Sequence, residues 1–120
     1  LLKLEPSNSQ AFYTKGFSYM KLNREDSSLF WFNKSIEAYP NADFVLEARG
    51  TLLFNKFKRY NEAIADFTKA IELNPKGEYF YKRSNCYFSM GDIVKAKSDA
   101  LIALQKGYAI PDAYKSSLQL

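Results

Sequence analysis

The sequence of 120 residues predicts an all-α fold in which short helices recur as pairs. The first observation is the spacing of Ala63, Phe67 and Ala70, which places two small side chains and one large aromatic ring on a single helical face. The second is that related triplets recur about 34 residues earlier and about 33 residues later. The third is that no segment shows the polar–apolar alternation of a strand. The earlier triplet is Ser28, Phe32 and Ser35, and the later one is Ala96, Ala100 and Ala103.

The helix boundaries follow from residues that favour turns and caps. Pro75 ends a helix because it lacks an N–H and disfavours helical geometry at the residue before it. Asn23 and Gly91 tolerate the left-handed conformation that commonly terminates a helix, and Asp43 and Asp92 are candidate N-caps. The expected helices span about residues 9–22, 26–38, 44–56, 60–75, 78–90 and 93–106, and a partial helix starts at Asp112.

The repeat divides the chain into segments 9–42, 43–76 and 77–110. Residues 1–8 are expected to complete a preceding repeat, and residues 111–120 to begin a capping helix or a further repeat. The opening residues Leu1 to Pro6 are similar to Ile71 to Pro75, which predicts that the chain begins within a longer array. Apolar residues near the two ends are expected to stack on further repeats or to cause self-association. These residues are Leu1, Leu2, Leu4, Leu118 and Leu120.

Composition limits the classes of function. The chain lacks histidine, which excludes histidine-based acid–base catalysis and histidine zinc sites within it, and we expect no enzyme and no cofactor. The carboxylates Asp66, Glu72 and Asp99 are interpreted as solvated helix surface. The single cysteine, Cys86, lies in an apolar run and is interpreted as packing; its isolation fits a reducing, cytoplasmic compartment. No apolar run is long enough to span a membrane.

Three copies of one pattern resemble the tetratricopeptide repeat. Gly16, Gly50 and Ser84 occupy the position where the two helices of a pair approach closely, and Phe32 and Phe67 occupy the buried aromatic position of the second helix. The resemblance implies a right-handed α-solenoid of three helix pairs plus a partial C-terminal helix. Two departures stand out: the turn within the second repeat has one extra residue, and the third repeat has Ala100 where an aromatic residue is expected. We interpret the third repeat as irregular or close to an array end.

The resemblance also implies a binding surface, because the first helix of each pair lines the concave side of such a solenoid. We therefore expect a non-catalytic scaffold that holds a partner segment in this groove, within a multiprotein assembly. Phe54 and Phe88 are also expected on the groove side of these helices, but they are interpreted as packing between repeats. The candidate contacts are Tyr13, Thr14, Phe17, Phe44, Glu47, Thr51, Tyr81, Lys82 and Asn85.

Family members that clamp the C-terminal carboxylate of chaperone tails use lysine, arginine and asparagine side chains. The matching positions here hold mostly other residue types, which argues against a chaperone tail as the partner. They are Tyr13, Phe17, Ala48, Glu78 and Lys82. Two alternatives stay open: an RNA-binding helical repeat that uses the basic turn around Lys58, and an interaction module attached to an enzyme or co-chaperone outside this segment.

Overall fold

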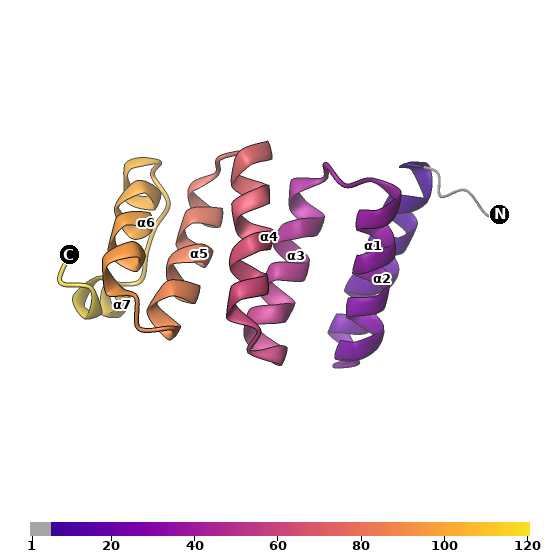
Figure 1. The fold of residues 1–120 in the computed structure, drawn as a ribbon, viewed down its shortest axis with the longest axis horizontal. Helices are drawn as coiled ribbons and strands as arrows, with labels where there is room; N and C mark the ends of the chain where they lie inside the picture. The colour runs from indigo at the N-terminus through magenta and orange to yellow at the C-terminus, as the bar shows by residue number, and fades with distance from the viewer. Residues whose placement is uncertain (1–5) are drawn as a thin grey trace.

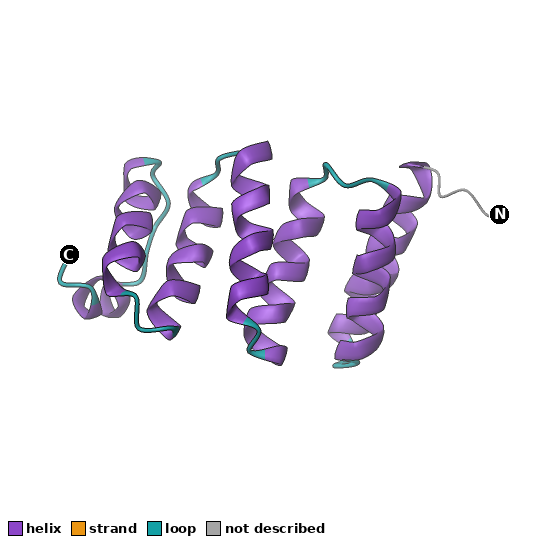
Figure 2. Ribbon diagram, in the orientation of Figure 1, coloured by secondary structure: helices purple, strands orange, loops and turns teal. Residues whose placement is uncertain are grey.

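The computed structural model describes the backbone of residues 6–120 and the side chains of residues 8–120. The described residues form helices and connecting turns, with no strand among them, so the predicted all-α fold class is confirmed (Figure 2). The expectations for Leu1, Leu2 and Leu4 fall outside the described residues. The elements are α1 (Pro6–Lys21), α2 (Glu25–Ala38), α3 (Asp43–Leu52), a π-helical turn (Leu53–Phe57), α4 (Tyr60–Leu73), α5 (Gly77–Ser89), α6 (Ile93–Gln105) and α7 (Asp112–Ser117).

The helices stack as three pairs along one axis, giving an elongated array of 53 × 26 × 21 Å (Figure 1). Helix α1 pairs with α2, α3 with α4, and α5 with α6, and the short α7 lies at the C-terminal end of the array. Because each helix is too short to be stable alone, the pairs depend on packing against their neighbours. The predicted solenoid of three helix pairs and a partial C-terminal helix is confirmed.

Small residues bring the two helices of each pair into contact, as predicted. A Cβ added at Gly16 would lie 2.5 Å from Cδ1 of Phe32, and one added at Gly50 would lie 2.9 Å from Cε1 of Phe67. In the third pair the Ser84 hydroxyl instead donates to the Ala96 carbonyl over 2.6 Å. The buried triplets recognised in the sequence are at the centre of these contacts. Ala63, Phe67, Ala70, Ser28, Phe32 and Ser35 are all at most 1% exposed.

The extra residue of the second repeat is absorbed at the end of its first helix. Residues Leu53–Phe57 form a π-helix, whose wider turn accommodates one more residue than an α-helical turn. Lys58 then adopts a left-handed conformation with φ of 55°, and the Arg59 N–H donates to the Leu53 carbonyl over 3.0 Å. Asn23 and Gly91, at the equivalent turns, also have positive φ, as their residue types predicted.

Two predicted helix starts were wrong. Helix α1 begins at Pro6 rather than at residue 9, because proline lacks only an N–H that the first turn leaves unpaired anyway. Ala42, not Asp43, is the N-cap of α3, and the Asp43 carboxylate instead accepts hydrogen bonds from the Tyr79 hydroxyl over 2.6 Å and from Asn74 over 3.2 Å. The predicted cap at Asp92 is confirmed by its bond to the Lys95 N–H.

The interpretation of Asp66 and Asp99 as solvated was also wrong, since they are 5% and 4% exposed. Each carboxylate receives two parallel hydrogen bonds from an arginine on the first helix of the same pair, at 2.7 and 2.9 Å in both cases. Arg49 binds Asp66 and Arg83 binds Asp99, a bidentate geometry that suits a buried carboxylate. Glu72 is exposed, as expected.

The C-terminal segment closes the third pair. Leu118 is only 2% exposed and lies in one apolar cluster with Phe80, Ala100 and Ile110, so it packs within this chain instead of stacking on a further repeat as expected. The absence of a large ring at Ala100 is matched by this packing of residues from the C-terminal segment. Leu120 is 38% exposed.

Candidate partner-binding surface

Aromatic side chains on α1 and α3 form the first part of the candidate surface. The Tyr13 ring stacks on Phe32 with centroids 5.9 Å apart and meets the edge of Phe44 at 5.2 Å. The Phe17 ring lies 6.1 Å from Tyr13, under the Lys21 ammonium at 5.0 Å. Tyr13 is half-buried, whereas Phe17 and Phe44 are 36% and 43% exposed. This part of the surface therefore offers apolar rings to solvent.

Charged side chains connect α3 to α5 in the second part. The Lys82 ammonium forms an ion pair with Glu47, donates to the Thr51 hydroxyl over 3.1 Å and lies 3.6 Å from a Glu78 oxygen. The Thr51 hydroxyl in turn donates to Glu47 over 3.0 Å. Lys82 is thus held between two carboxylates on neighbouring first helices.

A hollow of about 250 Å³ lies beside this cluster, between α3 and α5. We call it the α3/α5 hollow. Phe54, Phe67 and Tyr81 supply its apolar lining, and polar groups surround them. The polar lining residues are Thr51, Asn55, Lys82 and Asn85. Tyr81 also packs against Tyr108 and Tyr114, with centroids 5.4 and 5.6 Å away, so the C-terminal segment supports this wall.

Eight of the nine predicted residues thus fall into two groups, each linked by contacts or by the shared hollow, and we call them together the first-helix surface. They are Tyr13, Phe17, Phe44, Glu47, Thr51, Tyr81, Lys82 and Asn85. Thr14 lies apart from them, in a depression formed by α1 alone, where its hydroxyl donates to the Gln10 carbonyl.

Three further aromatic residues lie beside this surface. Phe54 packs between repeats, as interpreted, against a cluster that includes Phe67 and Cys86; it is half-buried, contacts the Tyr60 ring at 5.5 Å and also lines the α3/α5 hollow. Phe88 is 37% exposed and contacts Tyr114 at 5.5 Å. Tyr114 went unnoticed because α7 has no repeat-equivalent partner helix from which to infer its neighbours.

The local electrostatics are set by burial and by carboxylates. Burial raises the pKa of Tyr13, and the charge of Glu47 raises it further. Burial also raises the pKa of Tyr108, with Glu78 adding to the effect and Lys82 opposing it. Burial and the charge of Asp99 raise the pKa of the Cys86 thiol to about 12, so Cys86 stays protonated at neutral pH. Its predicted role in packing is confirmed by complete burial.

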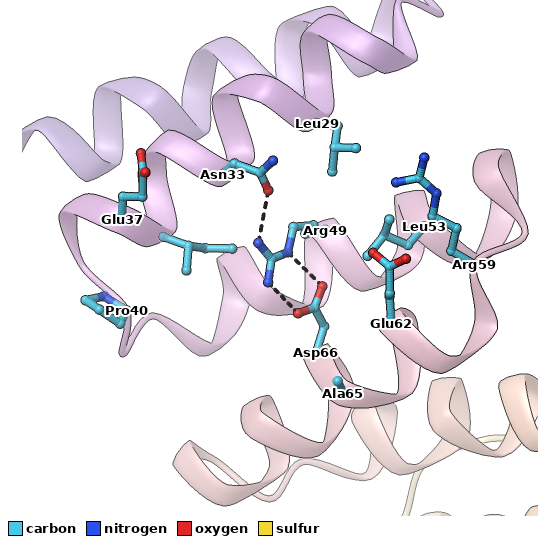
Figure 3. Close-up of a pocket in the computed structure, with 11 residues that line it drawn as sticks. Leu29, Asn33, Glu37, Pro40, Arg49, Leu53, Arg59, Glu62, Ala65 and Asp66 are labelled. Atoms are coloured by element: carbon cyan, nitrogen blue, oxygen red, sulfur yellow. Dashed lines mark hydrogen bonds and ion pairs between the residues drawn. The ribbon is translucent and has the colours of Figure 1, made fainter.

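A larger hollow of about 640 Å³ lies between the second helices α2 and α4 (Figure 3). The Arg49 guanidinium crosses it, bound to Asp66 and donating a third hydrogen bond to Asn33 of the preceding pair over 3.0 Å. Leu53 lines this hollow at the repeat position that the larger Tyr87 occupies in the next pair. Within its charged lining, Arg49 and Asp66 are bound to each other, and Arg49 also links the two pairs through Asn33.

The described residues contain neither a cluster of metal ligands nor a membrane-spanning helix. No group of three or more histidine, cysteine or acidic side chains is placed to hold a metal ion. None of the helices from α1 onward combines the length and the apolar character needed to cross a membrane.

Comparison with known proteins identifies the family. The family model described as "Tetratricopeptide repeat" matches residues 9–42 and 48–76. The chain belongs to the tetratricopeptide repeat family. Human Tetratricopeptide repeat protein 13 is 31% identical to it over 122 residues. That alignment covers 96% of this chain but only 14% of the human protein, so the chain corresponds to a small part of that relative's length.

Solved structures agree with this fold. The first tetratricopeptide domain of Spaghetti (RPAP3), bound to the HSP90 peptide SRMEEVD, superposes with a TM-score of 0.80 at 20% identity, covering 88% of this chain and 84% of that one. The OM64 domain of Arabidopsis gives 0.79 at 18% identity, covering 84% of each chain. The TPR2B domain of yeast Sti1, in a complex with pHsp70, gives 0.78 at 20% identity, covering 83% of this chain and 80% of that one. At these identities the likeness concerns the fold.

Proposed function

We propose that this chain is a non-catalytic interaction module that holds an extended or helical segment of a partner protein on the first-helix surface, as part of a multiprotein assembly. One observation carries the proposal: side chains from three successive pairs form an aromatic group around Tyr13 and a charged group around Lys82, and the α3/α5 hollow opens beside the charged group. Exposed aromatic rings beside a small hollow with a polar rim suit anchoring side chains of a peptide.

The family supports this class of function, because solved structures with the same fold are bound to peptides of HSP90 and pHsp70. The proposed ligand differs from those chaperone peptides in its chemistry. Lys82 is the single basic residue at the positions that match a carboxylate clamp, and Glu47 and Glu78 already engage its ammonium. A free carboxylate terminus would therefore find no unpaired cation at this position.

The proposal is tested by site-specific photo-crosslinking in the full-length protein. A photoreactive phenylalanine analogue replaces Phe44 in one variant and Val94, which is 82% exposed on α6, in the matched control. We expect covalent adducts with one defined partner segment from the Phe44 position and not from the Val94 position. Adducts formed equally at both positions, or only at Val94, would refute the proposed surface. Each adduct is mapped by mass spectrometry.

A further inference from the structure

The chemistry of the first-helix surface indicates what kind of segment it holds. Building on the proposed function, we infer that the partner segment carries a cationic side chain, arginine or lysine, that binds Glu47 and Glu78 beside a large apolar side chain seated in the α3/α5 hollow. This is the opposite charge to an acidic chaperone tail.

The charge of this region opposes that of the whole chain. The chain carries a net charge of +4. Around the α3/α5 junction, however, the carboxylates of Glu47 and Glu78 share one ammonium, that of Lys82, so this cluster has a net charge of −1. Arg49 and Arg83 belong to the same helices but are bound to Asp66 and Asp99. Complementarity to a negative patch favours a positive ligand.

Glu47 and Glu78 can each accept further hydrogen bonds while they contact Lys82. The recorded contacts of Glu47 with described residues, from Lys82 and Thr51, are made by Oε2, and an ionised carboxylate has lone pairs on both oxygens. The Glu78 side chain is 44% exposed and 3.6 Å from the Lys82 ammonium, too far for a short hydrogen bond. A second cation can therefore bind these carboxylates without displacing Lys82.

The field of the carboxylates extends along the surface. The charge of Glu47 contributes to the raised pKa of Tyr13 on α1 and of Tyr108 beyond α6, and Glu78 contributes to that of Tyr108. The α1 end is different, since Lys21 lies over the Phe17 ring there. The negative character is thus concentrated over α3 and α5, which fixes where the cationic side chain binds.

The size of the hollow defines the neighbouring residue. At about 250 Å³ it is below the range of about 300–1,000 Å³ that is typical of pockets for drug-sized molecules, and its lining combines three aromatic rings with polar rim groups. It suits one large apolar side chain. Because Lys82 lines the hollow and also contacts both glutamates, the two subsites are adjacent. The expected motif is therefore a bulky apolar residue with arginine or lysine close to it in the bound conformation.

The test is selection from a random peptide display library, followed by affinity measurements on one enriched peptide by fluorescence anisotropy. We expect enrichment of peptides that pair a large apolar residue with arginine or lysine. Replacing the cationic residue with its neutral analogue, citrulline or acetyl-lysine, is expected to weaken binding at least tenfold, about 1.4 kcal/mol. In the double variant Glu47→Gln with Glu78→Gln, the same replacement is expected to change binding less than threefold.

Two further variants test whether the effect is specific to Glu47 and Glu78. Glu37→Gln with Glu62→Gln removes as many charges as the Glu47→Gln, Glu78→Gln double variant, but beside the larger hollow between α2 and α4. It is expected to preserve the preference for cationic peptides. Lys82→Gln removes the competing ammonium and is expected to strengthen binding of the cationic peptide. Weaker binding by Lys82→Gln, with circular dichroism showing an intact fold, would overturn the inference, because it would mean that Lys82 itself binds an anionic group.

The outcomes separate this inference from the proposed function. If the enriched peptides depend on Phe44 and Tyr81 but show no basic preference, the first-helix surface binds peptides and the cationic inference is wrong. If binding is unaffected by Phe44→Ala and by Tyr81→Ala, the proposed function itself fails. Enrichment of acidic peptides whose binding requires Lys82 would also contradict the cationic inference.

Discussion

The first helix pair and the two that follow use different chemistry at the same positions. In α1 and α2 the Lys15 ammonium lies 4.2 Å from the centre of the Trp31 ring. In α3 and α4 the equivalent residues are Arg49 and Asp66, which form a bidentate ion pair. Arg83 and Asp99 repeat that arrangement in α5 and α6. One backbone arrangement therefore accepts either a cation–π contact or a buried ion pair.

The arginines also do more than join a pair. Arg49 donates to Asn33 on α2, and Arg83 donates to Thr68 on α4 over 3.2 Å, so each guanidinium ties three helices from two successive pairs. An ammonium has no planar fork with which to reproduce this pattern. The comparison teaches that an arginine at this position connects successive pairs in addition to joining the two helices of its own pair.

The largest expected effect separates these two chemistries. Arg49→Met leaves the Asp66 carboxylate, 6% exposed, without its partner, and is expected to lower the free energy of unfolding by about 3–5 kcal/mol. Lys15→Met removes a cation–π contact at a solvent-exposed ammonium and is expected to cost about 1 kcal/mol or less. Urea denaturation measures both. The double variant Arg49→Met with Asp66→Leu should recover most of the loss, and equal losses from the two single variants would contradict the comparison.

A second effect concerns the close approach within each pair. Gly16→Ala is expected to cost about 1–3 kcal/mol, because the new methyl group would lie 2.5 Å from the Phe32 ring. Gly50→Ala meets the Phe67 ring at 2.9 Å and is expected to cost less. Both variants gain up to about 1 kcal/mol in helix propensity, which offsets part of the loss. The order of the two melting temperatures is the test, and a Gly16→Ala variant more stable than wild type would refute the packing argument.

A third effect compares two serine hydroxyl groups that link the helices of a pair, one carried by the second helix of its pair and the other by the first. The Ser28 hydroxyl on α2 donates to the Gly16 carbonyl over 2.8 Å, whereas Ser84 on α5 contacts both the Ala96 carbonyl and the Tyr114 hydroxyl. Ser28→Ala should cost about 1 kcal/mol, and Ser84→Ala about 1–3 kcal/mol because the Tyr114 hydroxyl loses a partner. Adding Tyr114→Phe to Ser84→Ala should reduce that difference. Thermal unfolding of the three variants checks it.

The smallest effect is a pH dependence. Burial raises the pKa of Asp66 above its ordinary value of 3.8, although the hydrogen bonds and charge of Arg49 lower it. A raised pKa in the folded state means that the contribution of Asp66 to stability falls as pH rises from about 4 through the folded-state pKa. Arg49→Met removes the lowering influence and should raise the pKa further. The stability deficit of this variant is therefore expected to be smaller at pH 4 than at pH 7.

Denaturant titrations of Arg49→Met and wild type at the two pH values measure this change. The control is Asp66→Asn in both backgrounds, which removes the titrating group and should abolish the pH dependence of the difference. A deficit that stays constant between pH 4 and pH 7 would show that Asp66 does not titrate as its burial implies.

The sequence was sufficient for those parts of the fold that depend on helical periodicity. Ala63, Phe67 and Ala70 share a face, and their burial followed directly from their spacing. The burial of Asp66 and Asp99 was missed because a carboxylate on a helix was assumed to face solvent. A signal was present: an arginine precedes each aspartate by 17 or 16 residues, at the same repeat position in both pairs.

The remaining misses depend on contacts that no periodicity encodes. The burial of Leu118 depends on how a short terminal segment folds back onto α5 and α6. The Asp43 carboxylate accepts a hydrogen bond from Tyr79, which lies 36 residues further along the chain. For the candidate surface, the family resemblance and helix phase predicted nine contact residues, which stay a prediction. They did not reveal that Thr14 lies apart from the other eight or that Lys82 is engaged by two carboxylates.

The π-helical turn after α3 has a consequence for how such an array can vary. Gly16, Gly50 and Ser84 follow one another at a constant interval of 34 residues, while Ser28, Ala63 and Ala96 are separated by 35 and then 33. An added residue inside a helix would rotate everything beyond it by about 100°. Here the wider turn takes up the inserted residue. The first helices, which form the candidate surface, therefore keep a constant interval, and only the interval between second helices varies. Length changes engineered at Leu53–Phe57 should accordingly leave the phase of α5 unchanged, while displacing Phe54 and Asn55 at the α3/α5 hollow.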